Sequence, residues 1–538
     1  MLRRILASLF LLFIALGLYQ CARRGTPTGG PKDETPPELL RADPPNMTLN
    51  FDKQKIRLYF DELVKLKDVQ EQLIVSPPLK YPPQLSPQGG TAKYVEIQLK
   101  DTLLENTTYT LNFGQSIVDN NEENPNPFLT YVFSTGDYID SLELAGVVKD
   151  AFNKEADEFI SVMLYKIDTA YTDSTIYRRP PDYITNTLDS TVIFRLKNLK
   201  KGKYSLFAIK DANKDNIFDQ RTDKIGFVAD TINLPTDSIY LLNLFKEVQD
   251  YAVAVPSMVS KNRISFGYYG NGKNIEIKPL TTLPDTVKTT ILKEPKKDTL
   301  NYWFTPFEMD SIVFTVTNET LKVIDTFTVK KRKVATDSLI LSAEPRGSID
   351  FGQEFNISLN TPIVSADTSK ISMMVKDSIP MDFKVKLDSE ENRLNFDFPL
   401  EPNETYKIAL LPGAIEDFFG NKNDTLFYGL NTKSLADYGN LTLNLNGNNI
   451  KYPLIVQLTN EKGETQREIY AEQPTVYEFN NIKPASYMVR VIFDENKNGK
   501  WDTGSLSKKL QPEKVSYRPN MIEIRANWEV IETFNLLD

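Results

Sequence analysis

Beyond residue 40, apolar and polar residues alternate in short runs, and long helical periodicity is nearly absent. The runs include "KIRLYFDE", "KYVEIQLK", "TYTLNFG", "KYSLFAIK", "SIVFTVT" and "LTLNLN", and Asn, Asp, Gly and Pro separate them. An alternation of two places successive side chains on opposite faces of a strand. Short strands at this spacing are typical of β-sandwiches. We therefore predict an all-β chain, built as a string of β-sandwich domains.

The length and the composition support several domains of this kind. The chain has 538 residues, of which 41% are hydrophobic and 11% aromatic. This length exceeds one ordinary core, and the apolar content is sufficient for globular domains rather than disorder. We expect three to five domains.

The amino terminus follows a different pattern. Arg3 and Arg4 precede an apolar run from Ile5 to Leu18, which is short for a membrane span and is typical of a secretory signal peptide. Cys21, the only cysteine, follows directly. This arrangement resembles the lipobox of bacterial lipoproteins. The resemblance implies that residues 1–20 are a signal peptide and that the thiol of Cys21 is acylated.

Residues 21–35 are rich in Pro and Gly and lack apolar periodicity, so we expect a lipidated, flexible tether. The segment "RGTPTGGPKDETPP" resembles outer-membrane lipoproteins of the Bacteroidota that carry Ig-like domains. Ala22 stands where an Asp retains lipoproteins in the inner membrane. Arg23 and Arg24 stand where surface-exposed members carry an acidic run. The resemblance therefore implies a lipid anchor in the outer membrane, with the periplasmic face favoured over the cell surface.

One internal duplication joins the segments 104–121 and 400–421. "LENTTYTLNFGQSIVDNN" is similar to "LEPNETYKIALLPGAIEDFFGN", with Tyr109 matching Tyr406 and Asp119 matching Asp417. Together with "DETPP" and "IRLYFDE", the first copy resembles the bacterial Ig-like domain. We expect Ig-like domains at 36–140 and 336–436.

A second duplication has a constant offset of 283 residues and no gap. The first-copy positions are Phe194, Leu196, Leu199, Tyr204, Asp211, Asn213, Asp215 and Asp219, which match Tyr477, Phe479, Ile482, Tyr487, Asp494, Asn496, Asn498 and Asp502. Both copies resemble transthyretin-like or carboxypeptidase-regulatory-like β-sandwiches. We expect such small sandwiches at 141–245 and 437–538, with a β-rich middle domain of neither type at 246–335.

The second duplication contains the candidate metal ligands, in two loops with oxygen-bearing residues at alternate positions. They are Asp211, Asn213, Asp215 and Asp219 in the first loop, and Asp494, Asn496, Asn498 and Asp502 in the second. Calcium binds six to eight oxygens, and this spacing fills positions 1, 3, 5 and 9 of an EF-hand loop. Thr222 and Ser505 occupy the twelfth position, where an EF-hand has a bidentate Glu, and strands rather than helices flank both loops.

Two interpretations of these loops remain open. Each loop is either a structural calcium site that joins two strands, or a metal-free turn of Asn and Asp residues that tolerate left-handed backbone conformations. Phe218, Phe493 and Trp501 stand beside the loops, and we expect them to pin each loop to its own sandwich. Calcium is the one cofactor that the sequence indicates.

The residue types exclude several kinds of chemistry. The absence of histidine excludes Ser-His-Asp triads and His-ligated metals, and a single cysteine excludes internal disulfides. Adjacent carboxylates such as Asp61 and Glu62 point to opposite faces of a strand. We therefore predict no catalytic residues and no enzyme activity. With 63 basic and 72 acidic residues, the chain lacks the basic excess that nucleic-acid binding requires.

These observations predict a non-catalytic, lipid-anchored envelope protein that acts as a scaffold or interaction module for a protein partner. A more specific form is an accessory subunit of an outer-membrane β-barrel machine for assembly, transport or secretion. The alternative is an adhesin that binds a carbohydrate or surface polymer.

Overall fold

The computed structural model describes residues 33–127, 129–187, 192–376, 379–448 and 450–536. Strands dominate this part of the chain, and the predicted all-β class is confirmed. The helical elements described are the short α2 (Val69–Gln72), η1 (Thr175–Tyr177), η2 (Thr368–Lys370) and η3 (Leu435–Asp437). No helix among the described residues is long and apolar enough to cross a membrane.

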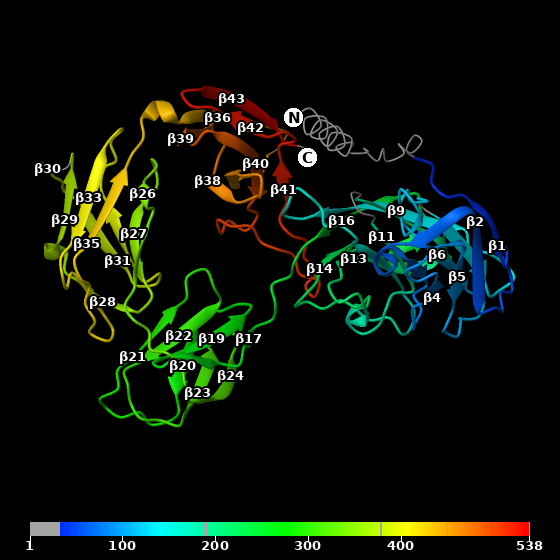
Figure 1. The fold of residues 1–538 in the computed structure, drawn as a ribbon, viewed down its shortest axis with the longest axis horizontal. Helices are drawn as coiled ribbons and strands as arrows, with labels where there is room; N and C mark the ends of the chain where they lie inside the picture. Colours follow the sequence, from blue (N-terminus) through cyan, green and yellow to red (C-terminus); the bar gives the residue numbers. More distant parts are fainter. Residues whose placement is uncertain (1–32, 128, 188–191, 377–378, 449, 537–538) are drawn as a thin grey trace, which may run out of the picture.

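The strands form five modules, numbered here in chain order (Figure 1). Module 1 has the sheets β1-β2-β5-β4, with β7 on β2, and β3-β6-β8. Its strands are β1 (Leu39–Asp43), β2 (Lys55–Leu66), β3 (Ile74–Ser76), β4 (Gln84–Ser86), β5 (Ala92–Gln98), β6 (Thr108–Asn112), β7 (Ile117–Asp119) and β8 (Thr130–Ser134).

Module 2 has the sheets β11-β10-β13-β14, with β15 on β13, and β12-β9-β16. Its strands are β9 (Leu142–Asp150), β10 (Ser161–Lys166), β11 (Tyr183–Asn186), β12 (Ile193–Leu199), β13 (Gly202–Lys210), β14 (Lys224–Phe227), β15 (Ile232–Leu234) and β16 (Ile239–Leu244).

The middle segment of the chain forms module 3, a sandwich of the sheets β17-β19-β22-β21, with β18 on β19, and β20-β23-β24. Its strands are β17 (Ala252–Val253), β18 (Ser257–Ser260), β19 (Arg263–Tyr269), β20 (Ile275–Pro279), β21 (Thr289–Lys293), β22 (Thr299–Phe304), β23 (Ser311–Asn318) and β24 (Val323–Lys330). Alternate residues of β23 are buried, as its apolar alternation requires.

Module 4 has the sheets β25-β27-β32-β31, β26-β35-β33-β29-β30 and β28-β34. Its strands are β25 (Leu341–Glu344), β26 (Gly347–Ser348), β27 (Phe355–Leu359), β28 (Ile363–Ala366), β29 (Ile371–Val375), β30 (Ile379–Pro380), β31 (Lys384–Asp388), β32 (Arg393–Asp397), β33 (Thr405–Leu410), β34 (Ile415–Asp417) and β35 (Leu426–Asn431).

Module 5 repeats the topology of module 2 strand for strand, in the sheets β38-β37-β40-β41, with β42 on β40, and β39-β36-β43. In both modules the last strand pairs in parallel with the first. Its strands are β36 (Gly439–Asn446), β37 (Leu454–Thr459), β38 (Thr465–Ala471), β39 (Tyr477–Ile482), β40 (Ala485–Phe493), β41 (Val515–Tyr517), β42 (Ile522–Ile524) and β43 (Glu529–Asn535).

The repeated tyrosines hold equivalent corners in each pair of modules. In modules 2 and 5, the hydroxyls of Tyr204 and Tyr487 donate to backbone carbonyls four residues earlier, at 2.9 and 2.8 Å. In modules 1 and 4, the hydroxyls of Tyr109 and Tyr406 accept from backbone N–H groups five residues earlier, at 2.9 and 2.7 Å. The similarity seen in the sequence therefore corresponds to the same local bonds in both copies.

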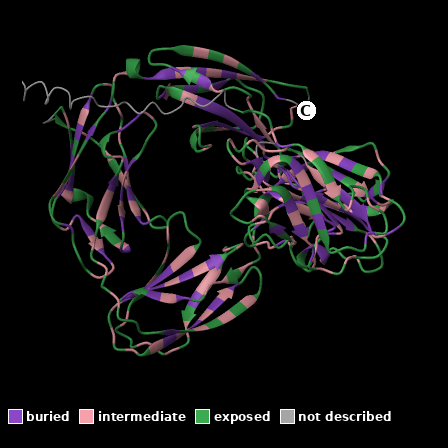
Figure 2. Ribbon diagram, turned by 45° about the vertical axis from the view of Figure 1, so that its right-hand side comes forward, coloured by how far each residue is buried: buried purple, intermediate pink, exposed green. Residues whose placement is uncertain are grey.

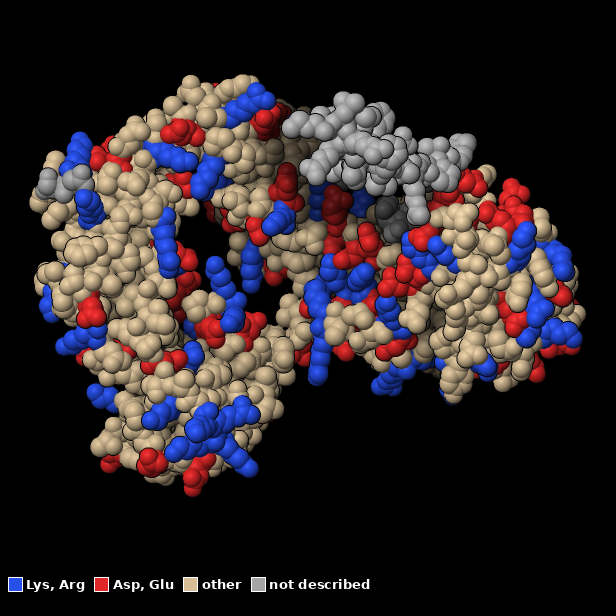
Figure 3. All heavy atoms as spheres, viewed as in Figure 1, with Lys and Arg blue, Asp and Glu red and all other residues tan. Residues whose placement is uncertain are grey.

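Modules 2, 3, 4 and 5 surround an opening, and module 1 lies outside it beside module 2 (Figures 1 and 3). Each module has its own buried core, so the buried residues form separate stripes in the five modules (Figure 2). Module 5 contacts module 2 across some 250 residues of intervening chain, and this contact closes the ring.

Candidate interaction surfaces

Cys21, the predicted lipidation site, lies outside the described residues, and its acylation stays a prediction. The described chain begins at Asp33, beside module 1. The side chain of Asn124 donates to the carbonyl oxygen of Asp33 at 2.9 Å. This bond fixes the point at which the predicted tether ends.

In module 2, the loop after β13 folds around the carboxylate of Asp211. Its oxygens accept hydrogen bonds from the backbone N–H groups of Asn213, Lys214 and Asn216, at 3.0, 2.7 and 2.7 Å. Burial raises the pKa of Asp211. These bonds are those of an Asx-type turn, in which a side chain replaces a backbone acceptor.

The remaining carboxylates of this loop have similar roles. Asp215 accepts from the N–H of Ile217, and Asp219 accepts from the N–H of Arg221, at 2.9 and 2.8 Å. Each carboxylate therefore stabilises the backbone two residues further along the chain.

In module 5, the equivalent loop folds around Asp494, which is only 1% exposed. Its carboxylate accepts from the N–H groups of Asn498 and Gly499, at 3.1 and 2.8 Å. The side-chain amides of Asn496 and Asn498 both donate to one oxygen of Asp502. The four predicted residues are thus brought together in one bonded turn.

Each loop has one further buried carboxylate that the repeat analysis missed. Asp223 accepts from the N–H groups of Ala212 and Asp219, at 3.0 and 2.8 Å. Glu513 accepts from the N–H groups at the equivalent positions of the other loop, each at 2.9 Å. Burial raises the pKa of Glu513. These two acids lie at different distances along the chain, so a gapless alignment does not pair them.

The calcium interpretation stays a prediction. The described residues include no group of three or more Asp, Glu or Cys side chains placed to hold a metal ion. The carboxylates of Asp211 and Asp494 instead face backbone N–H groups, which an ion would have to displace. The loops are satisfied as turns by their own hydrogen bonds.

The loop of module 5 continues into a segment that lies against module 2, here called the docking hairpin (residues 501–514). In Figure 1 this segment runs from β40 toward β14. Three hydrogen bonds join it to module 2: Thr503 to the carbonyl of Lys246 at 2.6 Å, the N–H of Leu506 to Glu247 at 2.5 Å, and Gln511 to the carbonyl of Phe227 at 3.0 Å.

Aromatic contacts complete this interface. The ring of Trp501 lies 4.8 Å from that of Phe152 in module 2, and the guanidinium of Arg490 lies 4.3 Å from the centre of the Phe152 ring. The Tyr517 hydroxyl donates to the Phe152 carbonyl at 2.6 Å. We expected Trp501 to pin its loop to its own sandwich. Its indole N–H does bond the Glu513 carbonyl, but its ring packs on the other copy.

A glycine permits the closest approach of the two modules. A Cβ on Gly504 would lie 2.6 Å from the ring of Phe245 and 2.7 Å from the carbonyl oxygen of Leu510. Real Cβ atoms essentially never approach other atoms this closely. The close fit of the docking hairpin therefore requires glycine at this position.

The largest cavity described lies between modules 1 and 2, with a volume of about 740 Å³. Module 1 supplies the apolar wall, which includes Leu73 and Pro83, and module 2 supplies Phe159, Asn186 and the loop of Asp211. Two grooves of about 420 and 510 Å³ flank the Asp494 loop of module 5.

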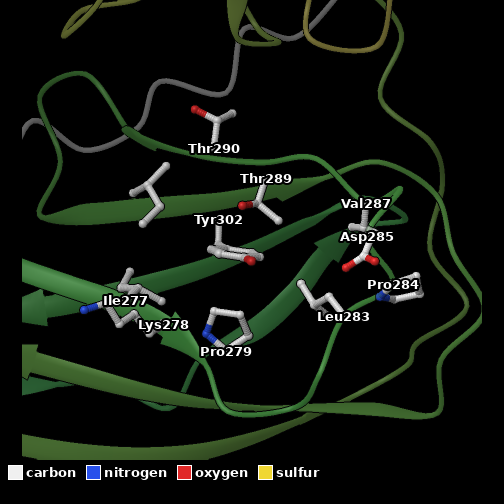
Figure 4. Close-up of a pocket in the computed structure, with 11 residues that line it drawn as sticks. Ile277, Lys278, Pro279, Leu283, Pro284, Asp285, Val287, Thr289, Thr290 and Tyr302 are labelled. Atoms are coloured by element: carbon white, nitrogen blue, oxygen red, sulfur yellow. The ribbon is translucent and has the colours of Figure 1, made fainter.

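Module 3 contains a separate pocket of about 540 Å³ between the edge strands β20 and β21 (Figure 4). Tyr302 lies at its centre, and Leu283, Pro284 and Asp285 form one side. Burial raises the pKa of Tyr302. The pocket is shallow and mixed in polarity, and no pair of carboxylates faces across its described lining.

Comparison with known families matches residues 33–135, most of module 1, to the family described as the bacterial Ig-like domain. This match confirms the resemblance of the first Ig-like segment. No curated protein matches the sequence.

Solved structures with similar folds include domains 1–6 of the surface layer protein SbsC. That match has 13% identity and a TM-score of 0.15, and it covers 91% of this chain and 67% of that one. A second is the Bacteroides ovatus mixed-linkage glucan utilization locus protein SGBP-B in complex with a mixed-linkage heptasaccharide, at 11% identity and a TM-score of 0.16, covering 69% of this chain and 89% of that one. A third is the BSP domain of a biofilm associated protein, at 10% identity and a TM-score of 0.16, covering 76% and 99%. Scores this low carry no argument about function.

Proposed function

We propose that this Ig-like domain protein is a non-catalytic scaffold of the bacterial outer membrane, anchored through Cys21 and facing the periplasm. The observation that carries the proposal is the closed ring. Because the two small sandwiches dock on each other, the modules form one frame rather than a flexible string, and a frame presents its surfaces in fixed relative positions.

The other junctions also have specific bonds, as a scaffold requires. Between modules 4 and 5, the buried carboxylate of Asp350 accepts from the Tyr438 hydroxyl at 2.8 Å and pairs with Lys483 at 2.6 Å. Between modules 3 and 4, Asp337 accepts from the hydroxyl of Ser260 at 2.6 Å. Contacts of this kind restrict rotation about the linkers, which tandem domains otherwise permit.

The anchor is tested by fractionating cells that express the Cys21→Ser variant. We expect this variant to leave the outer membrane for the soluble fraction, because acylation of the thiol supplies the membrane affinity. A variant that remained membrane-bound after a high-salt wash would contradict the anchor. Protease treatment of intact cells tests the orientation, and we expect protection.

The scaffold role is tested by crosslinking in the native envelope, followed by isolation of the tagged chain in mild detergent. A large β-barrel protein among the partners would support the accessory-subunit form of the proposal. Protease cleavage on intact cells, together with binding of a surface polysaccharide, would instead support the adhesin.

A further inference from the structure

Modules 2 and 5 share a concave surface beside the Asp/Asn loop. The strand registers and the offset of 283 residues pair six lining positions. Phe159, Asn186, Lys210, Asp211, Lys214 and Asn216 in module 2 correspond to Pro453, Tyr470, Phe493, Asp494, Lys497 and Gly499 in module 5. The surface is therefore a feature of the repeated sandwich, and its two copies can be compared directly.

In module 2, this surface is covered by module 1. The cover is the segment 69–89, here called the covering segment, which reads "VQEQLIVSPPLKYPPQLSPQG". Its residues that line the shared cavity include Leu73, Ile74, Val75, Pro78, Leu79, Pro82, Pro83, Leu85 and Pro87. An apolar, proline-rich stretch thus occupies the first copy of the surface.

Polar contacts fix the position of the covering segment. The ammonium of Lys214, in the Asp211 loop, pairs with the carboxylate of Glu71 at 2.7 Å. The hydroxyl of Ser76 accepts from the N–H of Ile184 at 3.0 Å. The cover leaves Asn186 only 8% exposed.

In module 5, the equivalent surface is open. Tyr470, at the position of Asn186, is 40% exposed, and residues of module 5 alone line both grooves. Module 4 precedes module 5 as module 1 precedes module 2, but it attaches elsewhere. Its Asp350 bonds Tyr438 and Lys483, which lie away from the Asp494 loop.

The open copy has more aromatic surface than the covered copy. Tyr470 replaces Asn186, Phe493 replaces Lys210, and Tyr452 lines both grooves. Grooves lined by aromatic side chains bind proline-rich segments, because an extended proline-rich chain is preorganised and its rings stack on aromatic faces.

The charge at this surface also has a counterpart in the covered copy. Lys497 occupies the position of Lys214 and has the same left-handed backbone, with φ of 64° against 59°. Among the described residues, no hydrogen bond or ion pair involves the Lys497 ammonium. A ligand that resembled the covering segment would supply the carboxylate that Glu71 supplies to Lys214.

We propose that the grooves of module 5 that flank Tyr452 and Pro453 bind a proline-rich, apolar polypeptide segment of a partner protein. An acidic residue of that segment pairs with Lys497, and its prolines lie against Tyr470 and Phe493. The proposal deepens the scaffold function and rests on it, since it gives the chemistry of the partner.

The test uses the purified chain of residues 22–538 and a fluorescent peptide with the sequence of residues 69–89, measured by fluorescence anisotropy. We expect saturable binding that Tyr470→Ala weakens at least about tenfold, because truncation of a central aromatic contact in an interface typically costs 1 kcal/mol or more. Tyr81→Ala in the peptide, outside the lining set, is the matched control and should bind as the unaltered peptide does.

Charge reversal gives the sharper readout. Lys497→Glu should weaken binding of the unaltered peptide, and a peptide with Glu71→Lys should restore it. Failure of the unaltered chain to bind, equal binding by Tyr470→Ala, or no restoration by the reversed pair would each overturn the proposal. So would binding of neutral oligosaccharide in place of the peptide. None of these results bears on the Cys21 anchor, which is tested separately by fractionation.

Discussion

Substitution of Gly504 by alanine should open the ring formed by modules 2 to 5. The added Cβ would lie 2.6 Å from the Phe245 ring and 2.7 Å from the carbonyl oxygen of Leu510, so the docking hairpin has to move away from module 2. No strain arises from the backbone conformation itself, because Gly504 is not among the glycines with a positive φ.

The magnitude follows from the cost of overpacking a close contact, about 1–3 kcal/mol. At about 1.4 kcal/mol for each factor of ten, the ratio of closed to open ring should fall roughly 5- to 150-fold. The interface hydrogen bonds from Thr503, Leu506 and Gln511 each contribute about 0.5–1.5 kcal/mol, so the substitution costs as much as losing one or two of them.

The assay is intramolecular thiol crosslinking. Cys21 is the only cysteine, so a chain of residues 22–538 carries none, and Asp173→Cys with Lys509→Cys introduces a unique pair. In the closed ring the side chains of Asp173 and Lys509 meet across the interface at 3.3 Å. A short bifunctional thiol reagent should therefore crosslink the unaltered ring rapidly and the Gly504→Ala variant slowly.

Gly429→Ala is the matched control, because a Cβ there meets nothing within 4 Å and its φ is not positive. This control should crosslink as the unaltered ring does. If Gly504→Ala crosslinks at the same rate as Gly429→Ala, the glycine does not govern closure and the steric argument is refuted.

Three further predictions concern the loops and the junction between modules 4 and 5. Tyr438→Phe should lower the free energy of unfolding by about 1–3 kcal/mol, because it removes the hydroxyl that donates to buried Asp350; an unchanged denaturant midpoint would contradict this. Asp494→Ala should cost about 1–3 kcal/mol by leaving the N–H groups of Asn498 and Gly499 without their acceptor, and calcium calorimetry on the same variant should show no heat if the unaltered loop binds the ion. Burial raises the pKa of Glu513 above its ordinary 4.5, so this group's contribution to stability is full below that value and is lost as the pH rises through the folded pKa. The stability of the unaltered chain relative to Glu513→Gln should therefore fall across that window in pH-dependent denaturation, and a constant difference would count against the buried environment.

The fold class was predictable because it depends on local patterns. Alternation in segments such as "SIVFTVT" specifies one buried face for each strand, and β23 buries that face. The offset of 283 residues likewise identified two sandwiches, whose tyrosine bonds at Tyr204 and Tyr487 coincide. Such features require only short-range information.

The docking of module 5 on module 2 was not predictable in this way. Trp501 and Gly504 lie in a polar, irregular segment, and nothing near them in the sequence indicates that Phe152 and Phe245 would face them. Glu513 was missed for a related reason, since the chain between the loop and this acid is longer than the chain between Asp211 and Asp223. An alignment that allowed a gap at this point would have paired the two acids.

The central claim is that a rigid, lipid-anchored frame presents the open surface of module 5 to an envelope protein. The most direct measurement places a photo-crosslinking amino acid at Glu472, on the rim of this surface, in cells with their native envelope. A second position at exposed Lys386, on module 4, serves as the control. The account predicts a covalent adduct with a protein that has a proline-rich segment, from Glu472 and not from Lys386. Equal adducts from both positions, or adducts with glycan alone, would contradict it.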